Sequence, residues 1–143
     1  MDKKTILVVD DDLAVLDYIH EILTMYGYES LPYSDASTAL SVIASGTSLD
    51  LAIVDLKMPE MNGLEFHARI KQLRPRLPCI VVTGQSSVES YLHAMDSGVF
   101  EYLNKPFSSR ELKAVVAAAL ETSEMMTGSG PEQILSPEFG VDQ

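Results

Sequence analysis

The sequence predicts an α/β fold: a doubly wound parallel sheet with helices on two faces. Three short apolar runs support this prediction, namely Thr5 to Val9, Leu51 to Val54 and Cys79 to Val82. None of them alternates between apolar and polar residues, and uninterrupted runs are typical of central strands buried on both faces of a parallel sheet. Segments with helical spacing lie between the runs, and this alternation indicates right-handed crossovers.

The first half of the chain contains two predicted helices and an edge strand. The first helix is predicted by apolar residues at steps of three and four: Leu13, Leu16, Ile19, Leu23 and Tyr26. Gly27 follows it as the expected C-cap. Tyr28 to Tyr33 is a poorer strand candidate because Pro32 is tolerated mainly at a sheet edge. A second helix is expected over Ala36 to Ala44, before Gly46.

The second half repeats the pattern. Leu64 to Leu73 is expected to be helical and to end before Pro75. The fourth helix is predicted by a stripe that Gly98 closes: Val88, Tyr91, Leu92 and Met95. Phe100 to Leu103 is a short candidate for the other edge strand. The last helix is predicted by a final stripe: Leu112, Val115, Val116, Ala119 and Leu120.

These elements make five strands and five helices. We expect the first strand to lie beside the third, which gives the flavodoxin-like order 2-1-3-4-5. The 143 residues suffice for one domain. Apolar periodicity stops at Thr122, and Gly128-Ser129-Gly130-Pro131 follows. We therefore expect a domain over residues 1–121 and a tail or linker over 122–143.

Composition excludes several classes of function. The 10 basic and 21 acidic residues give a net charge of −11, which argues against direct binding to nucleic acid or to an anionic membrane. The single Cys79 excludes an internal disulfide and a cysteine-rich zinc site. His20, His67 and His93 fall on different predicted helices, so no shared ligand set is expected. The sequence shows neither a signal-peptide core nor a membrane span, and we expect a cytoplasmic protein.

Polar side chains follow four of the predicted strands. Asp10 and Asp11 come after the first strand, Asp55 after the third, Thr83 after the fourth and Lys105 after the fifth. In an open α/β sheet the ligand crevice lies beyond the carboxyl ends of the strands, where the strand order reverses. We therefore expect these five side chains to converge on one edge of the sheet.

A cluster of carboxylates needs a cation. Two carboxylates about 4 Å apart repel by about 4 kcal/mol at an effective dielectric constant of about 20. Mg²⁺ suits such oxygen ligands and commonly bridges carboxylates to phosphoryl oxygens. Lys105 and the Thr83 hydroxyl are suited to holding a phosphoryl group opposite the ion. Asp12, by contrast, is expected to cap the first helix.

Four segments carry a family resemblance. They are Val8-Val9-Asp10-Asp11, Val54-Asp55-Leu56-Lys57-Met58-Pro59-Glu60-Met61-Asn62-Gly63, Val82-Thr83-Gly84 and Tyr102-Leu103-Asn104-Lys105-Pro106-Phe107. In order and spacing they resemble the receiver domains of response regulators, the phosphorylated proteins of two-component signal transduction. The resemblance covers roughly residues 4 to 121.

The resemblance implies a role for each metal-binding and phosphoryl-binding residue. Asp55 would accept the phosphoryl group as an aspartyl phosphate. The ligands of Mg²⁺ would come from Asp10, Asp11, Asp55 and the backbone carbonyl of Lys57. Lys105 would pair with the phosphoryl oxygens.

The resemblance also implies how the signal leaves the site. Thr83 would be the switch hydroxyl that turns toward the phosphoryl group, and Tyr102 the aromatic side chain that swings inward when Thr83 moves. The Lys105-Pro106 bond is expected to be cis, a geometry that X-Pro bonds adopt most readily. The surface of the fourth helix, fifth strand and fifth helix would be the readout.

The function so implied is a phosphoacceptor switch rather than an enzyme, although it would assist its own phosphorylation and dephosphorylation. A sensor histidine kinase or a phosphotransfer protein of a phosphorelay would supply the phosphoryl group. The switch would act on an unknown downstream protein, on an output domain outside this sequence, or through a homodimer. We expect no direct contact with nucleic acid or membrane.

Two alternatives remain open. The chain can be the receiver part of a larger transcription regulator. It can also be a hydrolase of the aspartyl-phosphate type, because Asp10-x-Asp12 superficially resembles the nucleophile motif of haloacid-dehalogenase phosphatases. That motif expects a Thr or Val where this chain has Leu13-Ala14. Such a hydrolase would carry the phosphoryl group on Asp10 and not on Asp55.

Overall fold

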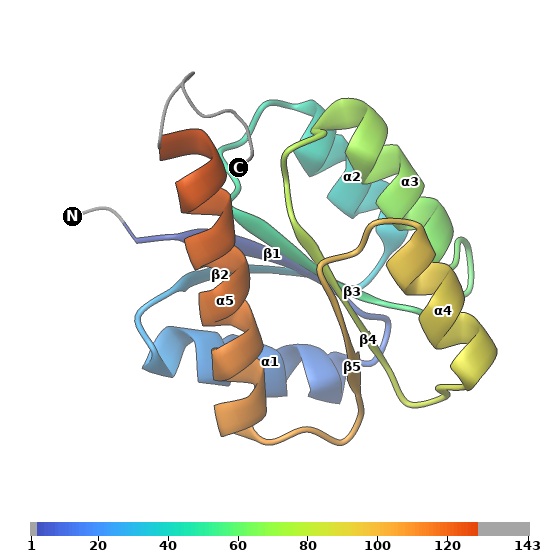
Figure 1. Cartoon of the computed structure of the whole chain (residues 1–143). Coiled ribbons are helices and arrows are strands. Elements are labelled where there is room, and N and C mark those ends of the chain that lie inside the picture. The colour runs from blue at the N-terminus through green and yellow to red at the C-terminus, as the bar shows by residue number, and fades with distance from the viewer. Residues whose placement is uncertain (1–2, 129–143) are drawn as a thin grey trace, which may run out of the picture.

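The computed structural model describes residues 3–128 and has a five-stranded parallel sheet at its centre (Figure 1). The strands are β1 (Thr5–Val9), β2 (Glu29–Tyr33), β3 (Leu51–Asp55), β4 (Cys79–Thr83) and β5 (Glu101–Asn104). Their order is β2-β1-β3-β4-β5, and every neighbouring pair is parallel. The predicted flavodoxin-like order is therefore confirmed, and both edge strands are the ones the sequence indicated.

Five helices cover the sheet. They are α1 (Leu13–Met25), α2 (Ala36–Ala44), α3 (Gly63–Leu73), α4 (Val88–Asp96) and α5 (Ser109–Gly128). Side chains of α1 and α5 pack in one core cluster, and side chains of α2, α3 and α4 pack in the other. The helices thus lie on the two faces of the sheet, as the alternation of strand and helix predicted (Figure 1).

Strand residues alternate between the two core clusters. Ile6 and Val8 face α1 and α5, whereas Leu7 and Val9 face the other layer of helices. All four of these side chains are fully buried. The runs lack polar alternation because both faces of the central strands are covered. Cys79 belongs to the same buried set, and burial raises the pKa of its thiol to about 12.

Some boundaries differ from the sequence-based expectation. The strand predicted over Phe100 to Leu103 is shifted by one residue and becomes β5. The last helix continues past residue 121 to Gly128 although its apolar stripe ends earlier. Glu and Met have good helix propensity, so a helix can continue where the sequence shows no further apolar stripe. Residues 129–143 of the predicted tail lie outside the described residues, so the domain boundary stays a prediction.

No helix in the described part of the chain combines the length and the apolar character that crossing a bilayer requires.

Candidate functional site

Three carboxylates meet at the carboxyl edge of the sheet. β1 and β3 are neighbours, with Val9 paired to Val54, so the residues that follow this pair lie side by side. Asp10 is fully buried, Asp55 is 4% exposed, and Asp11 is exposed. One oxygen from each carboxylate can be chosen so that all three lie within 4.8 Å of one another. The strand ends therefore bring the predicted acidic residues together.

Lys105 reaches this cluster from the loop after β5. Its Nζ lies 2.9 Å from Oδ2 of Asp10 and 3.4 Å from Oδ1 of Asp55. The backbone N–H of Lys105 donates to the Thr83 carbonyl over 2.8 Å, and the Lys105-Pro106 bond is cis, as expected. One ammonium group thus faces two nearly buried carboxylates, with the exposed Asp11 close by.

The electrostatics of the site follow from this imbalance. Burial and, after it, the negative charge of Asp10 raise the pKa of Asp55 to about 6, against the weaker opposing effects of Lys105 and the Lys57 backbone. Burial alone would lower the pKa of Lys105, but its hydrogen bond and charge interaction with Asp10, and then those with Asp55, raise it. Asp55 is still ionised at neutral pH, so the site carries excess negative charge that a cation can neutralise.

The turn after Asp55 depends on a glycine whose purpose the sequence alone did not reveal. A Cβ at Gly63 would lie 2.5 Å from the Asp55 carbonyl oxygen and 2.8 Å from the Leu56 Cα. The Gly63 N–H donates to the Leu56 carbonyl over 2.7 Å. Only a residue without a side chain fits there. Asn62 and Glu65 then start α3 with a reciprocal capping box.

Asp12 has the capping role that the sequence predicted. Its carboxylate accepts from the N–H groups of Ala14 and Val15 at 3.0 and 3.4 Å. Its own N–H donates to Oδ1 of Asp10 over 2.9 Å, so the cap also holds the Asp10 carboxylate in place. The third acid of the run therefore acts on the backbone of α1 and on Asp10.

Thr83 ends β4 and is fully buried. Its hydroxyl accepts a hydrogen bond from the Gln85 N–H over 3.1 Å, and its carbonyl accepts from Lys105. The hydroxyl predicted to act as a switch is therefore bound to the loop that leads into α4. The sequence alone did not indicate this contact with Gln85.

Tyr102 lies in the interior in this structure. It is 7% exposed, and its hydroxyl lies 2.6 Å from the Oγ of Ser90 on α4. Its ring meets that of Tyr91 edge-on, with centroids 5.4 Å apart at 87°. Sequence reasoning missed Ser90, although Ser87 and Ser90 have the spacing of a helix-start capping pair, a signal that could have found it.

The three histidines are not brought together as ligands of one site. His20 and His93 are exposed on α1 and α4, whereas His67 is buried on α3. Burial and the nearby Lys71 lower the pKa of His67. Among the residues whose side chains are described, the one acidic, histidine or cysteine group close enough to hold a metal ion is that of Asp10, Asp11 and Asp55.

Comparison with protein families gives one match that covers most of the chain. The model described as "Response regulator receiver domain" matches residues 6–117. Among curated proteins, the DNA-binding transcriptional regulator NtrC of Azospirillum brasilense is 41% identical over 123 residues, which are 86% of this chain and 25% of that protein. The response regulator MprA of Mycolicibacterium vanbaalenii is 36% identical over 125 residues, which are 87% and 54% of the two chains. The chain thus spans about a quarter to a half of these relatives.

Solved structures share this fold over most of the chain. A CheY-like response regulator receiver domain protein from Methanospirillum hungatei superposes with a TM-score of 0.83 at 34% identity, covering 87% of this chain and 99% of that one. NtrX from Brucella abortus, crystallised with ADP, superposes with a TM-score of 0.85 at 28% identity. The match covers 94% of this chain but 31% of NtrX.

Proposed function

Because the chain belongs to the response regulator receiver domain family, we propose that it is a phosphorylation-controlled switch with Asp55 as the phosphoacceptor. The observation that carries the proposal is the convergence of Asp10, Asp11 and Asp55 with Lys105 at the carboxyl edge of the sheet. Catalysis of phosphoryl transfer consists mainly of positioning and charge neutralisation, and this edge offers both.

The reaction assigns Asp55 the role of nucleophile. With its pKa at about 6, the Asp55 carboxylate is ionised at neutral pH. The phosphorus–nitrogen bond of a donor phosphohistidine breaks as a bond forms between phosphorus and an Asp55 oxygen, and the electron pair returns to the imidazole nitrogen. Lys105, 3.4 Å from Asp55, is placed to pair with the transferred phosphoryl oxygens.

The same residues fit a magnesium ion. Mg²⁺ binds oxygen ligands at about 2.0–2.1 Å, so ligands on opposite sides of the ion lie about 4 Å apart. The oxygens of Asp10, Asp11 and Asp55 lie within 4.8 Å of one another, which is close to this spacing. We assign them, with the Lys57 backbone carbonyl, as its ligands. When bound, the ion neutralises charge on the carboxylates and the phosphoryl oxygens.

The conformational response begins at Thr83. In the unmodified protein the Thr83 hydroxyl accepts a hydrogen bond from the Gln85 N–H. A phosphoryl group on Asp55 offers acceptor oxygens to this hydroxyl, which then turns away from Gln85. The movement of Tyr102, whose hydroxyl contacts Ser90 of α4, follows. The readout is the surface of α4, β5 and α5, where α4 exposes 76% of Val88 and 59% of Leu92. Apolar side chains of this kind suit a protein partner.

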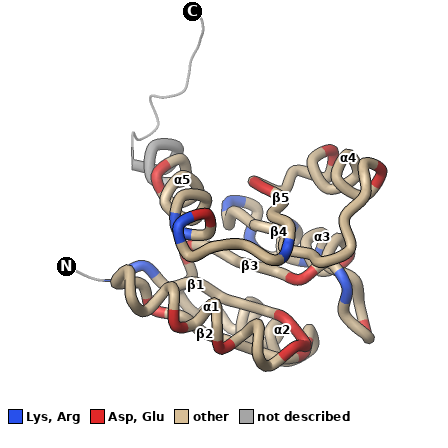
Figure 2. Tube along the Cα trace, turned by 90° about the horizontal axis from the view of Figure 1, so that it is seen from below, with Lys and Arg blue, Asp and Glu red and all other residues tan. Residues whose placement is uncertain are grey.

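The partners follow from this chemistry. A sensor histidine kinase or a phosphotransfer protein supplies the phosphoryl group, and a downstream protein, an output domain or a second copy of the chain receives the signal. Figure 2 shows acidic positions on α1 and α4, and the net charge is −11. A direct complex with nucleic acid or an anionic membrane is therefore not part of the proposal.

The test is the mass of the intact protein after incubation with acetyl phosphate and Mg²⁺. The parent gains the mass of one phosphoryl group, Asp55→Asn does not, and Asp17→Asn, which alters an exposed carboxylate of α1, gains it as the parent does. A gain retained in Asp55→Asn would contradict the proposal. So would no gain in the parent with both acetyl phosphate and a matched kinase.

The aspartyl-phosphate hydrolase alternative makes a different prediction. It requires the phosphoryl group on Asp10 and steady turnover of phosphomonoesters. Oδ2 of Asp10 lies 2.9 Å from the Lys105 ammonium and Oδ1 accepts from the Asp12 N–H, contacts that hold Asp10 in place as a ligand beside Asp55. Together with the family match, this favours the receiver.

A second candidate is the same switch as the receiver part of a longer regulator. The observation that favours it is the short span of the match, which covers 25% of the Azospirillum NtrC and 31% of the Brucella NtrX. We propose that the receiver ends near residue 121. In this candidate, the residues after that boundary would be a linker to a further domain rather than a tail. Mass spectrometry of the endogenous protein tests this candidate, because a mass equal to that of residues 1–143 would exclude it.

A further inference from the structure

The loop between β4 and α4 is fastened at both ends by hydrogen bonds. At its start, the Gln85 N–H donates to the Thr83 hydroxyl over 3.1 Å. At its end, Ser87 and Ser90 form a reciprocal capping box: the Ser90 N–H donates to Ser87 Oγ over 3.1 Å, and the Ser87 N–H donates to Ser90 Oγ over 3.2 Å. Two side chains therefore fix where α4 begins.

Ser90 has a further partner outside the helix. Its Oγ lies 2.6 Å from the Tyr102 hydroxyl, a contact that joins α4 to β5. A hydroxyl has one proton and two lone pairs. Ser90 Oγ can thus accept from both the Ser87 N–H and the Tyr102 O–H while donating to the Ser87 carbonyl 3.2 Å away. One atom then completes the cap of α4 and holds the aromatic hydroxyl.

Apart from these hydrogen bonds and the ring of Tyr91 against Tyr102, the start of α4 has few buried contacts. The one buried residue of the helix is Ala94, in its second half. Val88 in the first turn is 76% exposed, and Leu92 is 59% exposed. A helix end with so few buried contacts opens at low cost unless local hydrogen bonds hold it. The capping box and the bond to Tyr102 therefore contribute a large share of the stability of this turn.

We propose that Ser90 is the positioning residue that joins Tyr102 to the first turn of α4, so that the side chain and the helix start move together. This rests on the proposed function of Asp55 for its signalling role, whereas the bond itself is a property of the unmodified protein. When Thr83 turns toward the phosphoryl group, Gln85 loses its acceptor, the start of the loop is released, and the shift is carried to the end that Ser87 and Ser90 fasten. Ser90 passes that shift to Tyr102.

The first experiment measures backbone amide exchange in the unmodified protein. Tyr102→Phe removes only a hydroxyl, and it should lower the protection of the Ser90 and Tyr91 amides about fivefold, the effect of one net hydrogen bond. In a Ser90→Ala background the same Tyr102→Phe change should have no further effect. Ser90→Thr keeps a hydroxyl and should retain the response to Tyr102→Phe. The matched control is Tyr91→Phe, which removes a hydroxyl from the neighbouring ring and should leave the pair intact.

These single and double variants form a double-mutant cycle, and two results of this cycle would overturn the proposal. One is an equal effect of Tyr102→Phe in the parent and Ser90→Ala backgrounds, because the two hydroxyls would then act independently. The other is no effect of Tyr102→Phe in the parent. Tyr102→Phe keeps the ring contact with Tyr91, and Ser90→Ala introduces a residue of high helix propensity. The fold is therefore expected to persist in both variants.

The second experiment adds acetyl phosphate and Mg²⁺ and follows mass and amide exchange together. In the parent, a mass gain should accompany a change of about threefold or more in the exchange of the Ser90 and Tyr91 amides. Ser90→Ala should gain the same mass with little change in exchange, and Ser90→Thr should restore the change. A full response in Ser90→Ala, or none in a phosphorylated parent, would overturn the signalling role of Ser90. Absence of any mass gain would instead reject the function of Asp55, and the cycle on the unmodified protein would still decide the pairing.

Discussion

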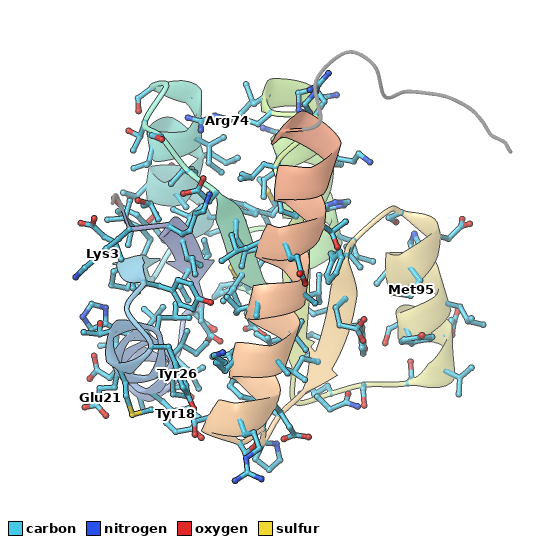
Figure 3. All side chains as sticks on the ribbon, turned by 60° about the vertical axis from the view of Figure 1, so that its left-hand side comes forward. Lys3, Tyr18, Glu21, Tyr26, Arg74 and Met95 are labelled. Carbon is cyan, nitrogen blue, oxygen red and sulfur yellow. The ribbon has the colours of Figure 1, made fainter. Side chains whose placement is uncertain are left out.

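At the amino edge of the sheet, Asp50 and Thr5 exchange two hydrogen bonds, whereas at the carboxyl edge Asp10 and Asp55 share a single lysine. The Thr5 N–H donates to Oδ2 of Asp50, and the Asp50 N–H donates to the Thr5 carbonyl, both over 2.8 Å. Nearby, the Arg74 guanidinium binds the Ile43 carbonyl at the end of α2 (Figure 3). These charged side chains satisfy backbone groups that would otherwise lack partners.

The carboxyl edge uses its charges differently. Asp55 has a backbone interaction with Lys57 and a long contact with Lys105, yet burial and the charge of Asp10 still raise its pKa to about 6. The unmodified site is therefore held in an arrangement that costs stability and that a cation or a phosphoryl group can relieve. Charge therefore contributes to stability at the amino edge and opposes it at the carboxyl edge.

The largest effect is expected at Gly63, on which the turn carrying Asp55 depends. Gly63→Ala places a methyl group 2.5 Å from the Asp55 carbonyl oxygen and should reduce the free energy of unfolding by about 3 kcal/mol, the upper range for overpacking. Gly84→Ala is the matched control, because its Cβ would meet nothing nearer than Lys105 at 3.9 Å. Urea denaturation of the two variants gives the comparison. Equal stabilities would show that the turn can move away from the added methyl group.

The next prediction compares the change in stability when an aspartate is replaced at each edge of the sheet. Asp55→Asn should increase the free energy of unfolding at pH 7.5 by about 2 kcal/mol, because it removes a buried charge whose pKa is raised by about two units. Asp50→Ala at the amino edge should decrease it by about 1 kcal/mol through the lost hydrogen bond to Thr5. Changes of opposite sign in the two free energies of unfolding would confirm that charge acts oppositely at the two edges. A loss of stability in both variants would contradict it.

The pH dependence supplies the control for that result. The folded pKa of Asp55, about 6, exceeds its ordinary value of 3.8, so the folded state binds the proton more tightly. The contribution of Asp55 to stability is favourable below pH 3.8 and is lost as pH rises through 6. The advantage of Asp55→Asn should therefore grow between pH 4 and pH 6 and level off above that range. An advantage that shrinks with rising pH would contradict the assigned direction of the pKa.

Much of this architecture could be predicted from the sequence because it depends on local signals. The central strands were found because Thr5 to Val9 and Cys79 to Val82 are uninterrupted apolar runs, buried from both sides. The bounds of β5 differ by one residue from the prediction because this edge strand alternates between buried and partly exposed residues and lacks an uninterrupted apolar run. The extension of α5 to Gly128 is not signalled by the sequence, because no apolar stripe continues beyond Leu120.

The site divides in the same way. Asp10, Asp11, Asp55 and Lys105 could be placed together because the carboxyl ends of parallel strands meet at one edge. The bond between Tyr102 and Ser90 could not, since it depends on where two side chains from different elements lie. The role of Gly63 also required coordinates, because the clash that excludes a side chain is with the backbone of Asp55 and Leu56.

The last prediction concerns the gain in the free energy of unfolding when Mg²⁺ is added, which should depend on the carboxyl edge and not on the amino edge. If the carboxylates at the carboxyl edge form the site, Mg²⁺ at ten times its dissociation constant should raise the free energy of unfolding by about 1.4 kcal/mol. Asp11→Asn should lose most of this gain because it removes an exposed ligand without disturbing the core. Asp50→Ala should keep the gain although it starts from a less stable protein. Thermal unfolding with and without Mg²⁺, at fixed ionic strength, measures all three. Because the fixed ionic strength keeps screening by salt the same in all samples, an equal gain in Asp11→Asn would show that the ion acts outside this site.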